Sequence, residues 1–357
     1  MSALESVFLT SKLSLKRNLS NYNFAISLPE DKAVEIYHKV THACSLLPDI
    51  LGPSFQFEFY ELEYINLLQQ KKYEAAWYLP ERIKHISKGQ GIAICQHCFI
   101  LINFDDHISI CGFCKNNSEI EQLASILYKV ETALGEMLSF AFDNELGFLT
   151  SDIHYLGVGL KYETYLASVF NLCSKKEKEF FLKKLKPILG TFFSLGIIQS
   201  FDEQAQDLEF VFYLSTLHSS VGNTKDFLQL VTETIEKITN LEIEKRFDLF
   251  SKNYDQVYDF ILRNFLISKH AILISEDQLF DLITAYLLGI QIGLLTNIDV
   301  AVVKKIFFDL RSIYVVEIIL NESKISLQDI TIKMIERKRA NILKTLFNTV
   351  CIKEFIE

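Results

Sequence analysis

Two closely spaced cysteine pairs are the residues of this 357-residue chain whose spacing most directly suggests a chemical role. Cys95 and Cys98 form one C-x-x-C pair, and twelve residues separate it from a second pair, Cys111 and Cys114. The intervening residues predict a strand, a polar turn and a returning strand, so both pairs should meet at one end of an antiparallel hairpin spanning residues 95–114. Four thiolates in such a place suit tetrahedral zinc, and a site closed by four protein ligands is structural rather than catalytic.

Other interpretations of these cysteines stay open. Free cysteines are common core residues, and a disulfide is a further alternative, although disulfides rarely persist in the cytosol. The start of the chain lacks the apolar segment of a signal peptide, so the sequence predicts a cytoplasmic protein. His97 and His107 are alternative metal ligands. The isolated Cys44, Cys173 and Cys351 lie in apolar periodic segments and are predicted to be core residues.

A glycine-containing loop over residues 140–161 forms a second group. It resembles the corresponding loop of the bacterial protein-arginine kinases, which belong to the ATP:guanido phosphotransferase superfamily. Asp152, Ile153, His154 and Tyr155 replace the family's Cys-Pro-Thr-Asn, and Lys161 replaces the Arg that clamps the nucleotide. The matching frame residues are Gly147, Leu149, Thr150, Ser151, Gly157, Gly159 and Leu160.

Further blocks resemble the same family in the same order along nearly the whole chain, at residues 7–24, 102–110, 195–222, 282–295 and 335–340. The resemblance implies an α+β fold. Residues 1–240 would form a guanido-kinase-like catalytic domain with an antiparallel sheet flanked by helices, and residues 241–357 an all-helical domain. It also implies transfer of a phosphoryl group from Mg-ATP to a protein arginine.

The positions that hold phosphate-binding arginines in the family carry other residues here. Phosphoryl transfer depends on charge neutralisation and in-line positioning, and a forked guanidinium grips phosphate at two points, which Lys and Ser cannot do. Each charged contact with a phosphate contributes about 1.5–3 kcal/mol. Without three of these contacts, the free energy of phosphate binding is weaker by roughly 5–9 kcal/mol. The five positions are Lys12, Ser14, Ser109, Lys161 and Gln199. The resemblance adds Thr10, Ser11 and Lys84 to the nucleotide site, with His85 as the alternative to Lys84.

Asp105 stands where the family has the second of two glutamates that orient and deprotonate the guanidinium. Such a base must lie within hydrogen-bond reach of the proton it takes. Asp105 is one methylene shorter than Glu, and the apolar Phe104 replaces the first glutamate. A simpler interpretation is that Asp105 and Asp106 belong to a polar turn between two strands.

The block at residues 335–340 resembles a motif that helps to form a phosphoarginine pocket in the family, within a helical tail that makes a homodimer. Ile335 and Glu336 replace its Arg and Asp, and Arg339 is retained. In this interpretation Glu336 pairs with the guanidinium and Arg339 with the phosphoryl group. The alternative is an ordinary solvated helix face, because residues 336–339 are all charged.

Two hypotheses about function follow. The first is a catalytically impaired pseudokinase, a regulatory or scaffold subunit in protein-arginine phosphorylation and protein quality control, with a zinc-finger activator and a protease or chaperone complex as partners. The second is an active protein-arginine kinase with a rebuilt nucleotide site. The replaced arginines favour the first. A net charge of −9 argues against a nucleic-acid partner, and the longest apolar run, residues 285–303, is interrupted by polar residues and predicts no membrane span.

The elements that must position these residues follow from apolar periodicity. Strands are predicted within residues 91–111 and 208–217. Helices are predicted at residues 30–47, 61–72, 117–138 with Ser118 as N-cap, 175–189, 224–238, 254–267, 276–293, 300–320 and 326–348.

Overall fold

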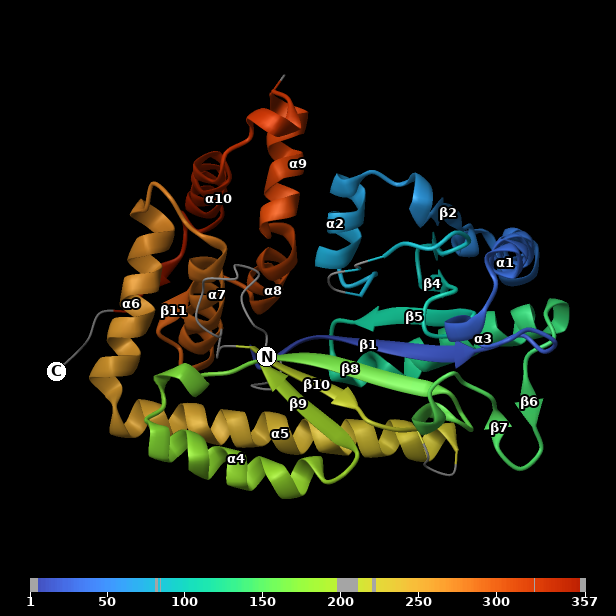
Figure 1. Cartoon of the computed structure of the whole chain (residues 1–357). Coiled ribbons are helices and arrows are strands. Elements are labelled where there is room, and N and C mark those ends of the chain that lie inside the picture. Colours follow the sequence, from blue (N-terminus) through green and yellow to red (C-terminus); the bar gives the residue numbers. More distant parts are fainter. Residues whose placement is uncertain are drawn as a thin grey trace.

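An antiparallel sheet is the centre of the computed structural model, which describes residues 6–80, 83, 85–197, 211–219, 223–323 and 325–353 (Figure 1). Within these residues, the eight strands of the sheet follow the order β2-β3-β4-β5-β1-β8-β10-β9, and all neighbours are antiparallel. Helices flank the sheet, which confirms the predicted α+β class. The strands are β1 (Phe8–Arg17), β2 (Glu58–Glu61), β3 (Gly91–Ile94), β4 (Phe99–Ile102), β5 (Ile108–Cys114), β8 (Leu160–Ala167), β9 (Phe193–Ile197) and β10 (Val211–Thr216).

The central strand β1 positions most of the predicted site residues. Successive side chains of a strand point to opposite faces of its sheet. Leu13 and Leu15 are fully buried in the core beneath the helices, so Lys12, Ser14 and Lys16 lie on the other side. We call the first side the helix face and the second the site face.

In the described part of the chain, α1 (Glu30–Leu51), α3 (Ile120–Met137) and α5 (Thr224–Lys252) pack on the helix face, and α4 (Lys175–Leu189) packs on α5 (Figure 1). α1 starts after Pro29, as predicted, but continues past residue 47 through Pro48. Gly52 ends it, with a φ of 104° that favours glycine.

Several boundaries differ from the predictions for local reasons. Residues predicted to begin a helix at 61 instead end β2 and form a 3-10 turn, so α2 is Leu67–Ala75 with Asn66 as N-cap. α3 follows another 3-10 turn, which moves its N-cap from Ser118 to Glu119. The capping box of Ser174 and Glu177 starts α4 at its predicted residue.

The helical region after the sheet consists of α6 (Tyr254–His270), α7 (Glu276–Gln291), α8 (Val300–Asp309), α9 (Ser312–Glu322) and α10 (Ile332–Leu346). A single helix was predicted over residues 300–320, but Arg311 is extended and separates α8 from α9. The reason is tertiary, because the Arg311 guanidinium donates to the Ala75 carbonyl at 2.9 Å and pairs with Glu276 at 3.3 Å.

The sheet and the helical region share a core. Leu9, Ala167 and Val211 of the sheet belong to the same buried cluster as α6, α7, α8 and α10. α5 runs across residues 240 and 241, and its buried Arg246 donates to the Ala167 carbonyl at 2.8 Å and to Gln291 of α7 at 2.7 Å. Among the described helices, none is both long and apolar enough to cross a bilayer.

Candidate functional site

Four of the five family arginine positions come together on the site face. Ser14 of β1 lies opposite Lys161 of β8, and Lys12 and Ser14 are separated by one residue along β1. Ser109 of β5 lies opposite Lys16 of β1 and therefore faces the same side. The fifth position, Gln199, and the nucleotide position Lys84 lie outside the described residues.

Glu163 forms ion pairs with both lysines that remain at these positions. One carboxylate oxygen of Glu163 lies 2.9 Å from the Lys12 ammonium group and the other lies 3.0 Å from that of Lys161. Tyr213 donates a hydrogen bond to the same carboxylate. Burial would raise the pKa of Glu163, but the two ammonium groups outweigh it and hold the pKa well below its usual range. Glu163 is therefore an anion at neutral pH, between two of the positions that hold arginines in the family.

Glu163 was not among the residues singled out from the sequence, although a signal was present. Glu163 follows Lys161 by two residues on a strand, and this spacing puts both side chains on one face. In a strand, a carboxylate two residues from a cation predicts that the two side chains form an ion pair with each other.

Lys16 is a further cation that was not predicted to belong to the site. Its side chain is nearly buried, and its ammonium group lies 3.3 Å from Asp106 and 3.4 Å from Asp105. Burial alone would lower the pKa of Lys16, but the carboxylates of Asp106 and Asp105 raise it. Lys16 also lies 5.0 Å from the centre of the Tyr155 ring. It connects the turn after β4 to the loop that replaces the family's Cys-Pro-Thr-Asn.

The two neighbouring aspartates have opposite environments. The Asp105 side chain is 82% exposed at the predicted turn, and Phe104 beside it packs partly on the core of β3, β4 and β5. Asp106 is fully buried and accepts hydrogen bonds from the Asn18 amide and the Ser151 backbone N–H, both at 2.7 Å. Asp105 is thus accessible to a substrate, whereas Asp106 holds the loop in place.

Two retained glycines of the loop, and the Arg17 side chain of β1 that one of them contacts, have structural roles. Arg17 is buried, pairs with Glu131 at 2.9 Å and donates to the Val158 carbonyl at 3.1 Å. Gly159 has a φ of 69°, and a Cβ there would lie 2.5 Å from the Arg17 guanidinium. Gly147 has a φ of 76°, and its Cβ would lie 2.7 Å from the backbone of the facing turn. Packing alone therefore requires these matching residues, whether or not the loop binds a ligand.

The other two predicted nucleotide residues of β1 lie on different faces. Thr10 shares the site face with Lys12, but its hydroxyl donates to the Cys114 carbonyl at 3.0 Å. Ser11 is fully buried and lies opposite Cys114 on the helix face. Ser11 therefore cannot contact a ligand on the site face.

The structure does not assemble the four cysteines predicted to bind zinc. β5 continues through Cys114, and an offset of three residues puts Cys111 and Cys114 on opposite faces of the sheet. Cys111 donates to the Ser14 hydroxyl at 3.3 Å on the site face, whereas Cys114 is buried in the core under the helices. Within the described residues, no group of three or more His, Cys, Asp or Glu side chains is arranged to hold a metal ion.

The first pair does come together. Cys95 and Cys98 close the turn between β3 and β4, and their sulfur atoms are 3.5 Å apart. The hydrogen bond from the Cys98 thiol lowers the pKa of Cys95 to about 7. Cys44 and Cys173 are buried, as predicted, but Cys351 is exposed.

Arg339 has a structural role that differs from the predicted phosphoarginine pocket. Its guanidinium is buried and donates to the Leu310 carbonyl at 2.8 Å, the Ile274 carbonyl at 2.7 Å and the Ser312 hydroxyl at 2.9 Å. These bonds join α10 to the ends of α8, α7 and α9. Glu336 is half-buried, and its backbone carbonyl accepts from the Ile274 N–H at 3.2 Å. The donors of Arg339 are thus occupied within the chain.

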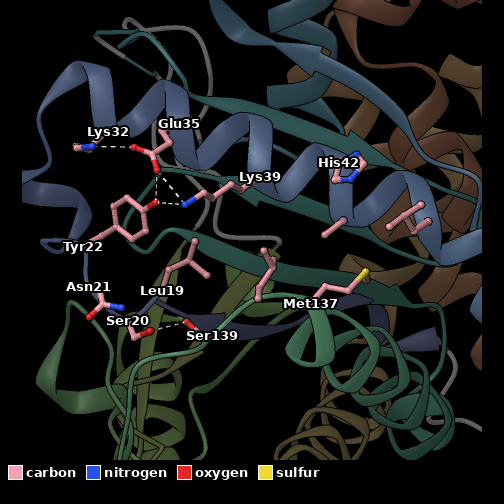
Figure 2. Close-up of a pocket in the computed structure, with 13 residues that line it drawn as sticks. Leu19, Ser20, Asn21, Tyr22, Lys32, Glu35, Lys39, His42, Met137 and Ser139 are labelled. Atoms are coloured by element: carbon pink, nitrogen blue, oxygen red, sulfur yellow. Dashed lines mark hydrogen bonds and ion pairs between the residues drawn. The ribbon is translucent and has the colours of Figure 1, made fainter.

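A separate cavity of about 740 Å³ lies between α1, the turn after β1 and the end of α3 (Figure 2). Figure 2 shows Lys32, Lys39 and Tyr22 converging on Glu35. The two ammonium groups lie 2.8 and 2.9 Å from its carboxylate, and the Tyr22 hydroxyl donates to it at 2.6 Å. Both ammonium groups are thus already paired with Glu35.

The described side chains do not fit the phosphates of Mg-ATP well. Both ammonium groups at the arginine positions are already paired, and the Glu163 carboxylate between them would repel a phosphate. Ser14 and Ser109 are buried and uncharged. At the positions that hold phosphate-binding arginines in the family, the two cations present therefore share one internal carboxylate.

Comparisons with known proteins identify the source of this arrangement. The family profile described as ATP:guanido phosphotransferase, C-terminal catalytic domain, matches residues 36–189. A protein-arginine kinase of Clostridium perfringens is 22% identical over 361 residues, covering 96% of this chain and 97% of its own. One from Staphylococcus haemolyticus is 24% identical over 342 residues, covering 95% and 93%.

Solved structures agree at the level of the fold. A lombricine kinase matches with a TM-score of 0.52 and 16% identity, over 67% of this chain and 66% of its own. The duplicated taurocyamine kinase of Schistosoma mansoni matches with a TM-score of 0.55 and 16% identity, over 76% of this chain and 36% of its own. The chain therefore resembles the ATP:guanido phosphotransferases, through the profile match over residues 36–189 and through two protein-arginine kinases that match almost from end to end.

Proposed function

We propose that this chain is a catalytically impaired protein-arginine kinase homologue that acts as a regulatory or scaffold subunit in protein-arginine phosphorylation and protein quality control. The observation that carries the proposal is the pairing of Glu163 with both Lys12 and Lys161. The Glu163 carboxylate already makes the contacts with the two ammonium groups that a phosphate would need to make. The two cations at the positions that would bind the nucleotide are already paired within the protein.

The magnitudes support impairment rather than modest weakening. A charged hydrogen bond between an arginine and a phosphate contributes about 1.5–3 kcal/mol, and freeing Lys12 or Lys161 for a phosphate would first break an ion pair with Glu163. The loss of roughly 5–9 kcal/mol of phosphate-binding free energy would weaken a micromolar affinity for the nucleotide to a negligible one.

The preserved shape supports a role in protein interaction. Arg17, Asp106 and the glycines of residues 140–161 hold the former active-site loop in a defined conformation without needing a ligand. We propose that this surface, together with homodimerisation through the helical domain of residues 241–357, binds partners. The partners that the family suggests are a zinc-finger activator and a protease or chaperone complex.

A kinase assay tests the proposal directly. The purified full-length chain is incubated with Mg-ATP and an arginine-rich acceptor protein, and phosphoarginine is sought by mass spectrometry under conditions that preserve acid-labile groups. We expect none above the level of an Asp105→Ala variant. Clear phosphoarginine that disappears in Asp105→Ala would overturn the proposal and support the alternative of an active protein-arginine kinase, which the exposure of Asp105 beside Lys16 favours.

Nucleotide binding tests the role of Glu163 separately. In titration calorimetry with Mg-ATP, we expect no measurable binding by the wild-type chain. Glu163→Gln frees two cations and should bind Mg-ATP measurably, at least about tenfold more tightly than the weakest affinity that the calorimeter detects, which corresponds to about 1.4 kcal/mol. Glu177→Gln is the matched control, because Glu177 also pairs with a lysine, Lys245 at 2.7 Å, but on α4 away from the site. Equal behaviour of the two variants would contradict the role of Glu163.

A further inference from the structure

We propose that Cys95 and Cys98 form a thiol–disulfide exchange site, which reacts with low-molecular-weight disulfides and closes to an intramolecular disulfide. The function proposed above does not use these residues. The inference rests on three features of the β3–β4 turn: its backbone geometry, the distance between its sulfur atoms and the unequal exposure of its two thiols.

The turn already has the conformation that a disulfide needs. The Cys95 N–H donates to the Cys98 carbonyl at 2.9 Å, so the strands on either side hold the ends of the turn together. The two sulfur atoms are 3.5 Å apart. A disulfide bond is about 2 Å long, and rotation of the two side chains can supply the difference without moving β3 or β4.

The two thiols are suited to different steps. Cys95 is partly exposed, whereas Cys98 is 5% exposed. An incoming disulfide therefore reaches Cys95 before Cys98. Cys98 lies behind it, protected from the external disulfide but within reach of the Cys95 sulfur.

The neighbouring groups do not supply a competing thiol. Cys44 of α1 is fully buried near this pair, and burial raises its pKa far above neutral, so it remains a thiol rather than a nucleophilic thiolate. His97 in the turn contacts the Phe55 ring, with centroids 5.1 Å apart. Cys111 and Cys114 are on β5 and bond elsewhere.

The chemistry is a balanced two-electron exchange. The Cys95 thiolate attacks a disulfide RSSR, which forms a Cys95–SR bond and releases RS⁻. Cys98 then loses its proton to solvent, and its thiolate attacks the Cys95 sulfur, which forms the Cys95–Cys98 bond and releases a second RS⁻. The dithiol is oxidised by two electrons, and RSSR is reduced to two thiols.

The site lies at the end of β4 opposite the Asp105 turn, because β4 connects the two turns. Oxidation should therefore leave the site face unchanged. The failure of this inference and the failure of the proposed function can be told apart, since neither assay above involves the β3–β4 turn.

The experiment uses the full-length chain with Cys351→Ser, because Cys351 is exposed and would react by itself. The reduced protein is equilibrated in buffers of reduced and oxidised glutathione, quenched with acid and analysed by intact mass and peptide mapping. We expect loss of two hydrogens and a Cys95–Cys98 cross-link. Cys98→Ser should instead keep one glutathione on Cys95, and Cys95→Ser should remain unmodified.

Three outcomes would overturn the inference. In the first, both thiols stay reduced in a buffer that oxidises a reference dithiol such as thioredoxin. In the second, the wild-type pair stops at a mixed disulfide with glutathione. In the third, Cys95 cross-links to Cys44 instead of Cys98. Circular dichroism of each serine variant verifies that it is folded. The rate of Cys95 alkylation by iodoacetamide in the unmodified protein gives an independent measure of access.

Discussion

Asp105 and Asp106 are adjacent in the chain but differ in what they contribute. Asp106 is buried, with two hydrogen bonds of 2.7 Å and an ion pair with Lys16 at 3.3 Å, whereas Asp105 is exposed. Removing one partner of a buried charged network costs about 3–5 kcal/mol, while an exposed substitution stays within about 0.5 kcal/mol.

We therefore predict that Asp106→Ala lowers the free energy of unfolding by about 3 kcal/mol and that Asp105→Ala leaves it nearly unchanged. Urea unfolding monitored by circular dichroism measures both. Equal destabilisation by the two substitutions would mean that the Asp105 turn is not as exposed as the structure shows.

Glu163 gives a prediction about pH. Its pKa in the folded protein is lower than in the unfolded chain, where it is about 4.3. Its ion pairs therefore stabilise the protein fully above pH 4.3, and this stabilisation is lost as the pH falls below that value toward the folded pKa.

The difference in unfolding free energy between wild type and Glu163→Gln should be about 1.5–3 kcal/mol at pH 7. It should shrink by about 1.4 kcal/mol for each pH unit below about 4.3. Urea unfolding of both proteins between pH 7 and pH 3 provides the measurement. A difference that does not change with pH would show that Glu163 is not held as an anion by the lysines.

At the scale of elements, α10 depends on a buried arginine. Arg339 joins α10 to the ends of α8, α7 and α9 through three hydrogen bonds. Arg337, two residues earlier on the same helix, is exposed. We predict that Arg339→Met lowers the unfolding free energy by about 3 kcal/mol, because three buried acceptors lose their donor, and that Arg337→Met changes it by less than about 0.5 kcal/mol. Thermal unfolding followed at 222 nm distinguishes the two.

Free phosphoarginine provides the complementary measurement for α10. If Arg339 is occupied as the structure shows, the ligand should not raise the melting temperature of the wild-type chain. Stabilisation that is lost in Arg339→Met but kept in Arg337→Met would restore the predicted pocket.

At the scale of the whole molecule, the cooperativity of unfolding can be followed by tryptophan fluorescence. Trp77 is the single tryptophan. It stacks on Tyr165 of the sheet with ring centroids 3.6 Å apart and contacts Phe307 and Phe308 of α8 at 5.6 and 5.3 Å. Its fluorescence therefore reports on the contact between the sheet and the helical region.

Since the two parts also share a core and are joined by Arg246, we predict one cooperative transition. The fluorescence of Trp77 and the circular dichroism at 222 nm should change at the same urea concentration. A fluorescence change that precedes the loss of helix would show that the helical region separates and remains folded by itself.

The sequence alone determined many of the helices, part of the sheet and the family frame. The alternation of apolar residues in residues 91–111 predicted the β3, β4 and β5 strands, and apolar periodicity predicted both ends of α4. The frame residues of 140–161 and the replaced arginines were also readable, because they depend on residue type and order. Such features are local, so a linear pattern contains them.

Only the tertiary structure decided which side chains meet. The pairing of Glu163 with Lys12 joins residues far apart in the chain, and it appears only when β1 and β8 are placed in register. The cysteine spacing suggested a metal site, but β5 continues through Cys114 and turns its two thiols to opposite faces. Arg339 is recognisable in the sequence as a motif residue, but its burial and its three partners depend on how α7, α8, α9 and α10 pack. The chain itself specifies the residue types, whereas burial and ion pairing come from contacts between distant segments.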